Sequence, residues 1–155
     1  MSNDRGFGIH GLGEIALRCA NLVEMTAFYE QVIGLKRLPG NRTPDIVFFD
    51  IAEGVAGHRA VLALFHTPDM VRCTGALHHI ALSLPLAEQS AAMKWYDRIG
   101  QPYRVELFDW IGWRGLFTQD PEGNTVELVA YDASLVDAAS ARRNTGLSGS
   151  DISGR

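Results

Sequence analysis

The sequence predicts an α+β fold built from two β-α-β-β-β modules in one chain. A strand-helix opening occurs twice, at positions about 65 residues apart, and a series of short strand patterns follows each opening. The first opening begins at Leu12 and its helix ends at Gly34, whereas the second begins at Leu77 and its helix ends at Gly100. Two long copies are too few for a solenoid array, so a paired-module fold is the better interpretation.

The opening of the first module shows a half-buried strand followed by a capped helix. Apolar and polar residues alternate along Leu12–Cys19, as expected when one face of a strand is buried. Asn21 then offers a side-chain cap, and Glu24 follows at capping-box spacing. Gly34 tolerates the left-handed backbone that ends a helix. The alternating faces carry Ile15, Leu17 and Cys19 on one side and Glu14, Ala16 and Arg18 on the other.

The second module repeats this opening and ends in a strong hairpin signal. His79, Ala81 and Ser83 alternate with apolar residues, and a helix is predicted over Leu86–Ile99. Asp120–Asn124 reads Asp-Pro-Glu-Gly-Asn, with proline and glycine at the places that a tight turn favours. The remaining predicted strands are Asp45–Ile51 and Arg59–Phe65 in module one and Tyr103–Trp110, Trp113–Gln119 and Asn124–Tyr131 in module two.

Length and composition fit a single globular domain. The chain has 155 residues, of which 46% are hydrophobic and 21% charged, so most of it is expected to fold. We predict one domain over residues 1–132, with module one at about 8–70 and module two at about 75–132. The tail, residues 133–155, is rich in Ala, Ser, Arg and Gly and is expected to be partly disordered.

Charge and hydropathy argue against nucleic acid and membranes as binding partners. The net charge of −4, with scattered Lys and Arg, offers no basic stripe for nucleic acid or an anionic membrane surface. Apolar stretches are too short to span a bilayer, and no secretory signal pattern is found, so a cytoplasmic protein is expected. Cys19 and Cys73 lack metal-site spacing, and Cys19 is expected to be a buried thiol.

Three segments give the chain a resemblance to a known family. They are Glu14-Ile-Ala-Leu, His79-Ile-Ala-Leu and the run Asp120–Leu128, which reads Asp-Pro-Glu-Gly-Asn-Thr-Val-Glu-Leu. Together they resemble the vicinal oxygen chelate superfamily, which includes glyoxalase I, extradiol dioxygenases and bleomycin resistance proteins. The resemblance covers roughly Gly8 to Tyr131.

The resemblance implies a cup lined by metal ligands from the first and last strands of each module. Carried over by position, the ligands are Glu14 in module one and His79 and Glu127 in module two, and Glu127 is also the candidate catalytic residue. The fourth ligand position holds Ala63. One imidazole and two carboxylates suit Fe, Mn, Ni, Co or Zn and leave coordination sites open for the oxygen atoms of a small substrate.

Other interpretations of the same residues stay open. A glutamate or histidine on a strand is often an ion-pair or hydrogen-bond partner rather than a ligand. Ala63 favours a metal-free, ligand-sequestering protein of the bleomycin-resistance type. Extradiol dioxygenases generally have His at the position of Glu14 and Tyr at that of Phe117, which disfavours that reaction.

Secondary expectations concern neighbouring residues and assembly. Strand alternation predicts that His78 points away from the side chain of His79. His10, His58 and His66 are weaker ligand candidates. Exposed sheet edges at the module ends make a homodimer the expected assembly. Aromatic residues that could line a substrate pocket are Phe65, Trp110, Trp113 and Phe117.

Overall fold

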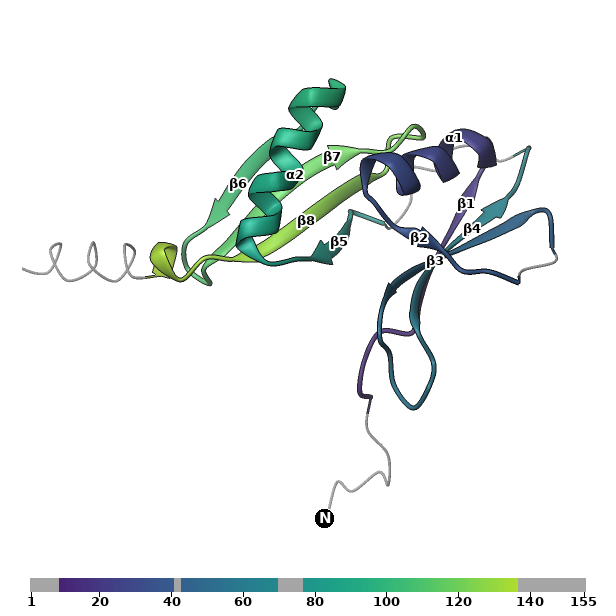
Figure 1. Cartoon of the computed structure of the whole chain (residues 1–155), viewed down its shortest axis with the longest axis horizontal. Helices are drawn as coiled ribbons and strands as arrows, with labels where there is room; N and C mark the ends of the chain where they lie inside the picture. The colour runs from purple at the N-terminus through teal and green to yellow at the C-terminus, as the bar shows by residue number, and fades with distance from the viewer. Residues whose placement is uncertain (1–8, 41–42, 70–76, 137–155) are drawn as a thin grey trace, which may run out of the picture. The chain divides into compact units, whose positions relative to one another are not determined.

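The computed structural model describes residues 9–40, 43–69 and 77–136. The chain forms two compact units, Met1–Thr74 and Gly75–Arg155, and each contains one four-stranded mixed sheet. This is the predicted α+β architecture of two repeated modules (Figure 1). No helix in the described part of the chain is both long and apolar enough to cross a membrane. Cys73 and most of the predicted tail lie outside the described residues.

The first unit has strand order β1-β4-β3-β2, in which β1 runs parallel to β4 and the other neighbours are antiparallel. Asn21 accepts a hydrogen bond from the backbone N–H of Glu24, which confirms the predicted helix cap. The elements are β1 (Glu14–Cys19), α1 (Leu22–Ala27), η1 (Phe28–Val32), β2 (Lys36–Arg37), β3 (Ile46–Ala52) and β4 (Ala60–His66).

The second unit has strand order β5-β8-β7-β6, and β5 runs parallel to β8. Helix α2 begins and ends where the sequence predicted, and Gly100 closes it in the left-handed conformation. Asp120 accepts hydrogen bonds from the backbone N–H groups of Glu122 and Asn124, which stabilises the predicted turn. The elements are β5 (Ile80–Ser83), α2 (Leu86–Ile99), β6 (Arg104–Phe108), β7 (Trp113–Gln119) and β8 (Thr125–Tyr131).

Two details of the first unit differ from the expectation. The single predicted helix changes from α-helical to π-helical geometry at Phe28, where wider hydrogen-bonded turns continue to Val32. The second strand of the module is the two-residue β2, which the sequence did not reveal because Lys36 and Arg37 are both exposed and carry no apolar alternation.

The two units share one strand register. Ala16 pairs with Ala63 in the first unit, and Ala81 pairs with Glu127 in the second. Ala16 and Ala81 each lie two residues after Glu14 and His79, so these two residues occupy equivalent places. By the same comparison, Ala63 is the counterpart of Glu127. The register therefore agrees with the residue equivalences on which the predicted ligand set is based.

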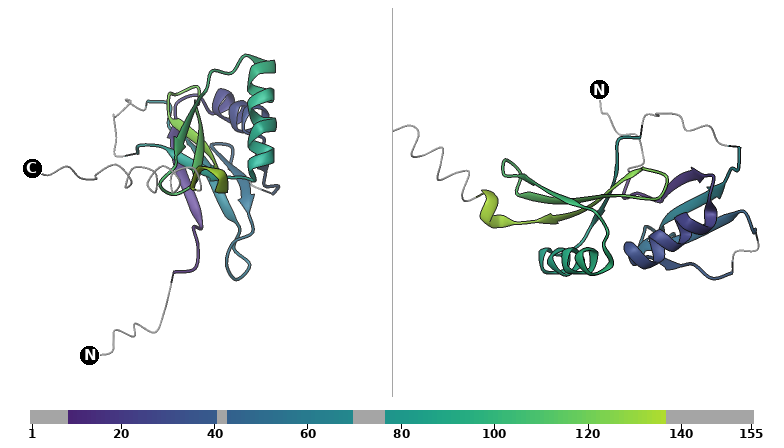
Figure 2. Two further views of the ribbon diagram at one scale, coloured as in Figure 1. Left: turned by 90° about the vertical axis from the view of Figure 1, so that its left-hand side faces the viewer. Right: turned by 90° about the horizontal axis from the view of Figure 1, so that it is seen from above.

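A buried glutamine ties helix α2 to the second sheet. Gln89 is fully buried, and its side-chain Nε2 donates hydrogen bonds of 2.7 Å to the carbonyl oxygens of Arg114 and Leu128. These carbonyls belong to β7 and β8, so one side chain connects the helix to two central strands. Helix α2 lies along one face of the strands, as Figure 2 shows.

We expect Gln89→Leu to destabilise the protein, although leucine has a similar volume and is apolar. The substitution leaves two buried carbonyl oxygens without their donors, which costs about 1–3 kcal/mol. Chemical denaturation should report this loss as a lower midpoint. The exposed neighbour Ser90 provides the control, because Ser90→Ala should change stability by less than about 0.5 kcal/mol. Equal effects of the two substitutions would contradict the assigned role of Gln89.

Candidate functional site

The second unit brings two of the three predicted ligands together. Nε2 of His79 lies 3.1 Å from Oε2 of Glu127. Glu127 comes from the central strand β8, on the face opposite α2, and His79 immediately precedes the edge strand β5. The His79 side chain is 33% exposed, whereas that of Glu127 is only 7% exposed. The pair thus offers one accessible imidazole and one sheltered carboxylate.

Gly115 creates the space that the Glu127 carboxylate occupies. A Cβ atom at position 115 would lie 2.5 Å from Oε1 of Glu127 and 2.5 Å from Cε2 of Phe117. Both distances are far below normal contact, so any larger residue would force these side chains to move. Phe117 is buried and faces Glu127 across the β7–β8 pair. A glycine and an aromatic ring therefore shape the surroundings of the carboxylate.

Burial raises the pKa of the Glu127 carboxyl above its ordinary value. Desolvation is the main cause, and the nearby Glu106 carboxylate raises the pKa further. The electrostatic interaction and the hydrogen bond with His79, and the charge of Arg104, oppose this shift. The carboxylate is thus held in an environment that an additional cation would stabilise.

His78 is in contact with His79, contrary to the prediction from strand alternation. The two Nδ1 atoms are 2.7 Å apart, and the rings meet edge to face. The alternation argument was wrong here because both residues precede Ile80, the first residue of β5, so they are not bound by the geometry of the strand. When Nε2 of neutral His79 donates to Glu127, its Nδ1 accepts from His78.

The His79–Glu127 pair fits the demands of a divalent transition metal. Two donors that are each about 2.1 Å from one ion, at right angles, lie about 3.0 Å apart. The Nε2 to Oε2 distance of 3.1 Å is that of a hydrogen bond and is also compatible with this separation. Imidazole nitrogen and carboxylate oxygen are the donors that Fe, Mn, Co, Ni and Zn accept. His78 can then act as the outer partner of Nδ1 that metal-bound histidines require.

Glu14 and Ala63 lie in the first unit, whereas His79 and Glu127 lie in the second. Glu14 is the exposed first residue of β1 and makes no ion pair among the described residues. Ala63 is fully buried in β4. No group of three His, Cys, Asp or Glu side chains is found within residues 9–40, 43–69 and 77–136. The assignment of Glu14 as the third ligand remains a prediction.

Two charged residues beside the His79–Glu127 pair, Arg104 and Glu106, were not predicted from the sequence. Arg104 pairs with Phe117 in the β6–β7 register, and Glu106 pairs with Gly115, so both share the face of Glu127. Arg104 donates from Nε to Oε1 of Glu106 at 2.8 Å. Arg104 and Glu106 are two residues apart in the predicted strand Tyr103–Trp110, so the sequence indicated that they share one face. Only the strand register shows that this is the face of the Glu127 carboxylate.

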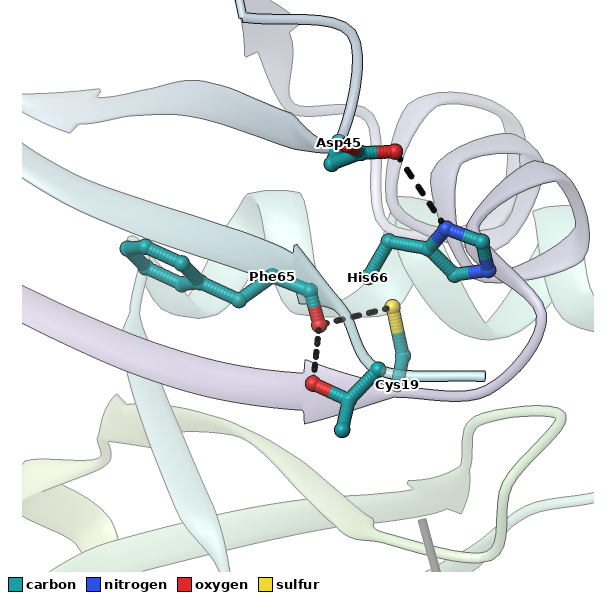
Figure 3. Close-up of polar contacts among 5 residues, drawn as sticks. Cys19, Asp45, Phe65 and His66 are labelled. Atoms are coloured by element: carbon teal, nitrogen blue, oxygen red, sulfur yellow. Dashed lines mark hydrogen bonds and ion pairs between the residues drawn. The ribbon is translucent and has the colours of Figure 1, made fainter. Parts of the chain in front are cut away.

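A second polar cluster lies at the end of β1 and β4 in the first unit (Figure 3). Nδ1 of His66 is 3.5 Å from Oδ1 of Asp45, and the buried Cys19 thiol donates to the carbonyl oxygen of Phe65 at 3.8 Å. Thr67 donates to the same carbonyl. The prediction that Cys19 is a buried thiol is confirmed, and its contact is structural.

The other secondary candidates are mostly exposed. His10 and His58 lie at the surface, as do Trp110 and Trp113, whereas Phe65 is half-buried in the first unit. Of the aromatic residues considered for a substrate pocket, Phe117 is the one next to the pair, with its ring centre 6.0 Å from that of His79.

Comparison with known proteins identifies the family to which this arrangement corresponds. Residues 11–128 match the model of the Glyoxalase/Bleomycin resistance protein/Dioxygenase superfamily. The fold is similar to lactoylglutathione lyase from Agrobacterium tumefaciens, with 22% identity, a TM-score of 0.57 and coverage of 77% of this chain and 92% of that one. It is also similar to a glyoxalase/dioxygenase from Nostoc punctiforme, with 18% identity, a TM-score of 0.63 and coverage of 83% and 92%. A comparison with curated proteins gave no match.

The burial of Cys19 predicts slow thiol chemistry in the native protein. In a Cys73→Ser variant, a thiol reagent should modify Cys19 only slowly under native conditions and rapidly in denaturant, because the sulfur is inaccessible until the sheet opens. Absorbance or mass measurement of the labelled fraction follows the reaction. Rapid, complete labelling of the native protein would show that the thiol is accessible.

Proposed function

Because this chain belongs to the Glyoxalase/Bleomycin resistance protein/Dioxygenase superfamily, we propose that it is a metal-dependent enzyme. Its metal ligands are Glu14, His79 and Glu127. Its substrate is a small molecule that approaches the metal through oxygen atoms. The ion is Fe, Mn, Ni, Co or Zn, the metals that a histidine and carboxylate set accommodates.

The observation that carries this proposal is the contact between His79 and Glu127. The imidazole of His79, just before edge strand β5, and the buried carboxylate of Glu127 in the adjacent strand β8 lie 3.1 Å apart, close enough to bind one ion together. The strand register supports the choice of Glu14, because it makes Glu14 the counterpart of His79 in the first unit.

Each protein group has a definite role in this proposal. The ion supplies Lewis-acid chemistry, stabilising negative charge that develops on a substrate oxygen. Glu127 is both a ligand and the group next to the substrate that exchanges a proton. Phe117 excludes water from one side of the carboxylate.

A metal-free binding protein of the bleomycin-resistance type is the second candidate. Its support is Ala63, which places a buried methyl group where the second unit has Glu127. Binding of an aromatic or cationic ligand that is insensitive to strong chelators and to Glu14→Ala would favour this alternative. Metal analysis of protein purified without chelator separates the two, since the enzyme should retain, or take up on reconstitution, close to one equivalent.

We expect metal to raise the thermal stability of the protein. An ion that binds only the folded state contributes about 2.7 kcal/mol when its free concentration is 100-fold above the dissociation constant. His79→Ala and Glu127→Gln should remove most of this stabilisation, and Glu14→Gln should reduce it. Thermal unfolding with and without added Mn²⁺, Co²⁺ or Zn²⁺ measures the effect.

Two further histidine variants make this test specific. His78→Ala removes only the partner of Nδ1, so metal affinity should fall by roughly 10- to 100-fold without disappearing. His58→Ala, an exposed control in the first unit, should leave the metal-induced shift unchanged. An undiminished shift in His79→Ala would mean that the ion binds elsewhere.

Gly115→Ala should weaken metal binding and, because the added Cβ also overlaps the buried Phe117 ring, lower the stability by about 1–3 kcal/mol. The added Cβ would overlap Oε1 of Glu127, so the carboxylate must move away from its place beside His79. Loss of an outer hydrogen-bond partner of a ligand costs roughly 10- to 100-fold in metal affinity, and displacing the ligand itself should cost at least as much. Calorimetric titration with Co²⁺ measures this loss, and the circular dichroism of the metal-free variant reports on the fold. Wild-type affinity in Gly115→Ala would contradict the assigned position of Glu127.

The expected homodimer is likewise a proposal. The edge strands β5 and β6 present backbone groups that a second chain could pair with. Sedimentation that shows a monomer at micromolar concentration would contradict it.

A further inference from the structure

Arg104 lies on the same face of the second sheet as the His79–Glu127 pair. Glu127 of β8 pairs with Phe117 of β7, and Phe117 pairs with Arg104 of β6. Paired residues of neighbouring strands point to the same side of a sheet. The three side chains therefore form a row across the sheet, with the phenyl ring between the carboxylate and the guanidinium.

The guanidinium of Arg104 is held over the ring of Phe117. Its Cζ atom lies 4.4 Å from the ring centre, within the range of a cation–π contact. The ring is buried beneath it, and its centre is 6.0 Å from that of the His79 imidazole. The guanidinium thus stands one aromatic ring away from the proposed metal ligands, and its charge lowers the pKa of Glu127.

The hydrogen bonds of Arg104 leave part of its guanidinium available. Arg59 engages Asp50 through both Nε and a terminal nitrogen. Arg104, in contrast, donates to Glu106 through Nε, and its terminal nitrogens have no hydrogen bond to the residues that the structure describes. Its side chain is 59% exposed. Glu106 and Phe117 therefore orient the guanidinium without using the terminal N–H groups.

We infer that Arg104 binds an oxyanion of the substrate, a carboxylate or a phosphate, while the oxygen atoms at the other end of the substrate meet the metal. Terminal N–H groups of arginine bind such planar or multidentate oxyanions strongly. A short organic segment of the substrate spans the Phe117 ring between the two anchor points. This inference rests on the proposed function for the second anchor point, whereas the oxyanion site itself is independent of metal.

The test uses the full chain without metal, so a failure of metal binding does not affect it. Benzoate and phenyl phosphate serve as oxyanion probes, and benzamide is the neutral control of similar shape. Calorimetry gives the affinities, and the NMR signal of the Arg104 Nε–H group reports where each probe binds. We expect both anions to bind and shift this signal, and benzamide to bind at least about tenfold more weakly. The tighter anion identifies the substrate class.

Matched arginine variants connect the binding to this residue. Arg104→Gln should weaken anion binding by about tenfold or more, and Arg104→Lys, which keeps the charge but loses the planar fork, by a smaller factor. Arg98→Gln is the control, because Arg98 also stacks on an aromatic ring, that of Trp95, at 5.3 Å. Equal binding of benzamide and benzoate, unchanged affinity in both Arg104 variants, or an equal loss in Arg98→Gln would overturn the inference.

Discussion

A carboxylate buried beside an imidazole is the feature on which the proposed chemistry of this chain depends. Glu127 lies on a central strand, where desolvation raises the pKa of its carboxyl. His79 at 3.1 Å offsets part of this cost, and Gly115 provides the room for the arrangement. A bound divalent ion would compensate the charge more fully, which explains why we interpret this pair as part of a metal centre rather than as a structural ion pair.

The two units have the same strand register but carry different side chains at equivalent positions. The register that pairs Ala81 with Glu127 pairs Ala16 with Ala63, so equivalent backbone positions carry a carboxylate in one unit and a methyl group in the other. The first unit thus offers one candidate ligand, Glu14, and the second offers two. In the proposed site, three protein ligands would leave more of the coordination shell to a substrate than four would.

Sequence patterns predicted the features that depend on local chemistry. The cap at Asn21 and the turn at Asp120 follow from side chains that satisfy nearby backbone groups, and both are observed. The helix Leu86–Ile99 follows from helical spacing of its apolar residues and from Gly100 at its end, and it is observed as well. Features that depend on register were not predictable. Arg104 and Glu106 became neighbours of Glu127 only when β6, β7 and β8 were aligned. The contact between His78 and His79 was misjudged because the strand begins at Ile80, after both histidines, and not at Leu77.

The most direct test of the central claim is anomalous diffraction from crystals of the protein grown with Co²⁺ or Mn²⁺, recorded at the absorption edge of the metal. The account predicts one strong peak between Nε2 of His79 and the carboxylate of Glu127, with Glu14 completing the protein ligands. A peak at another place, such as His66 and Asp45, or no peak at full metal concentration would contradict it.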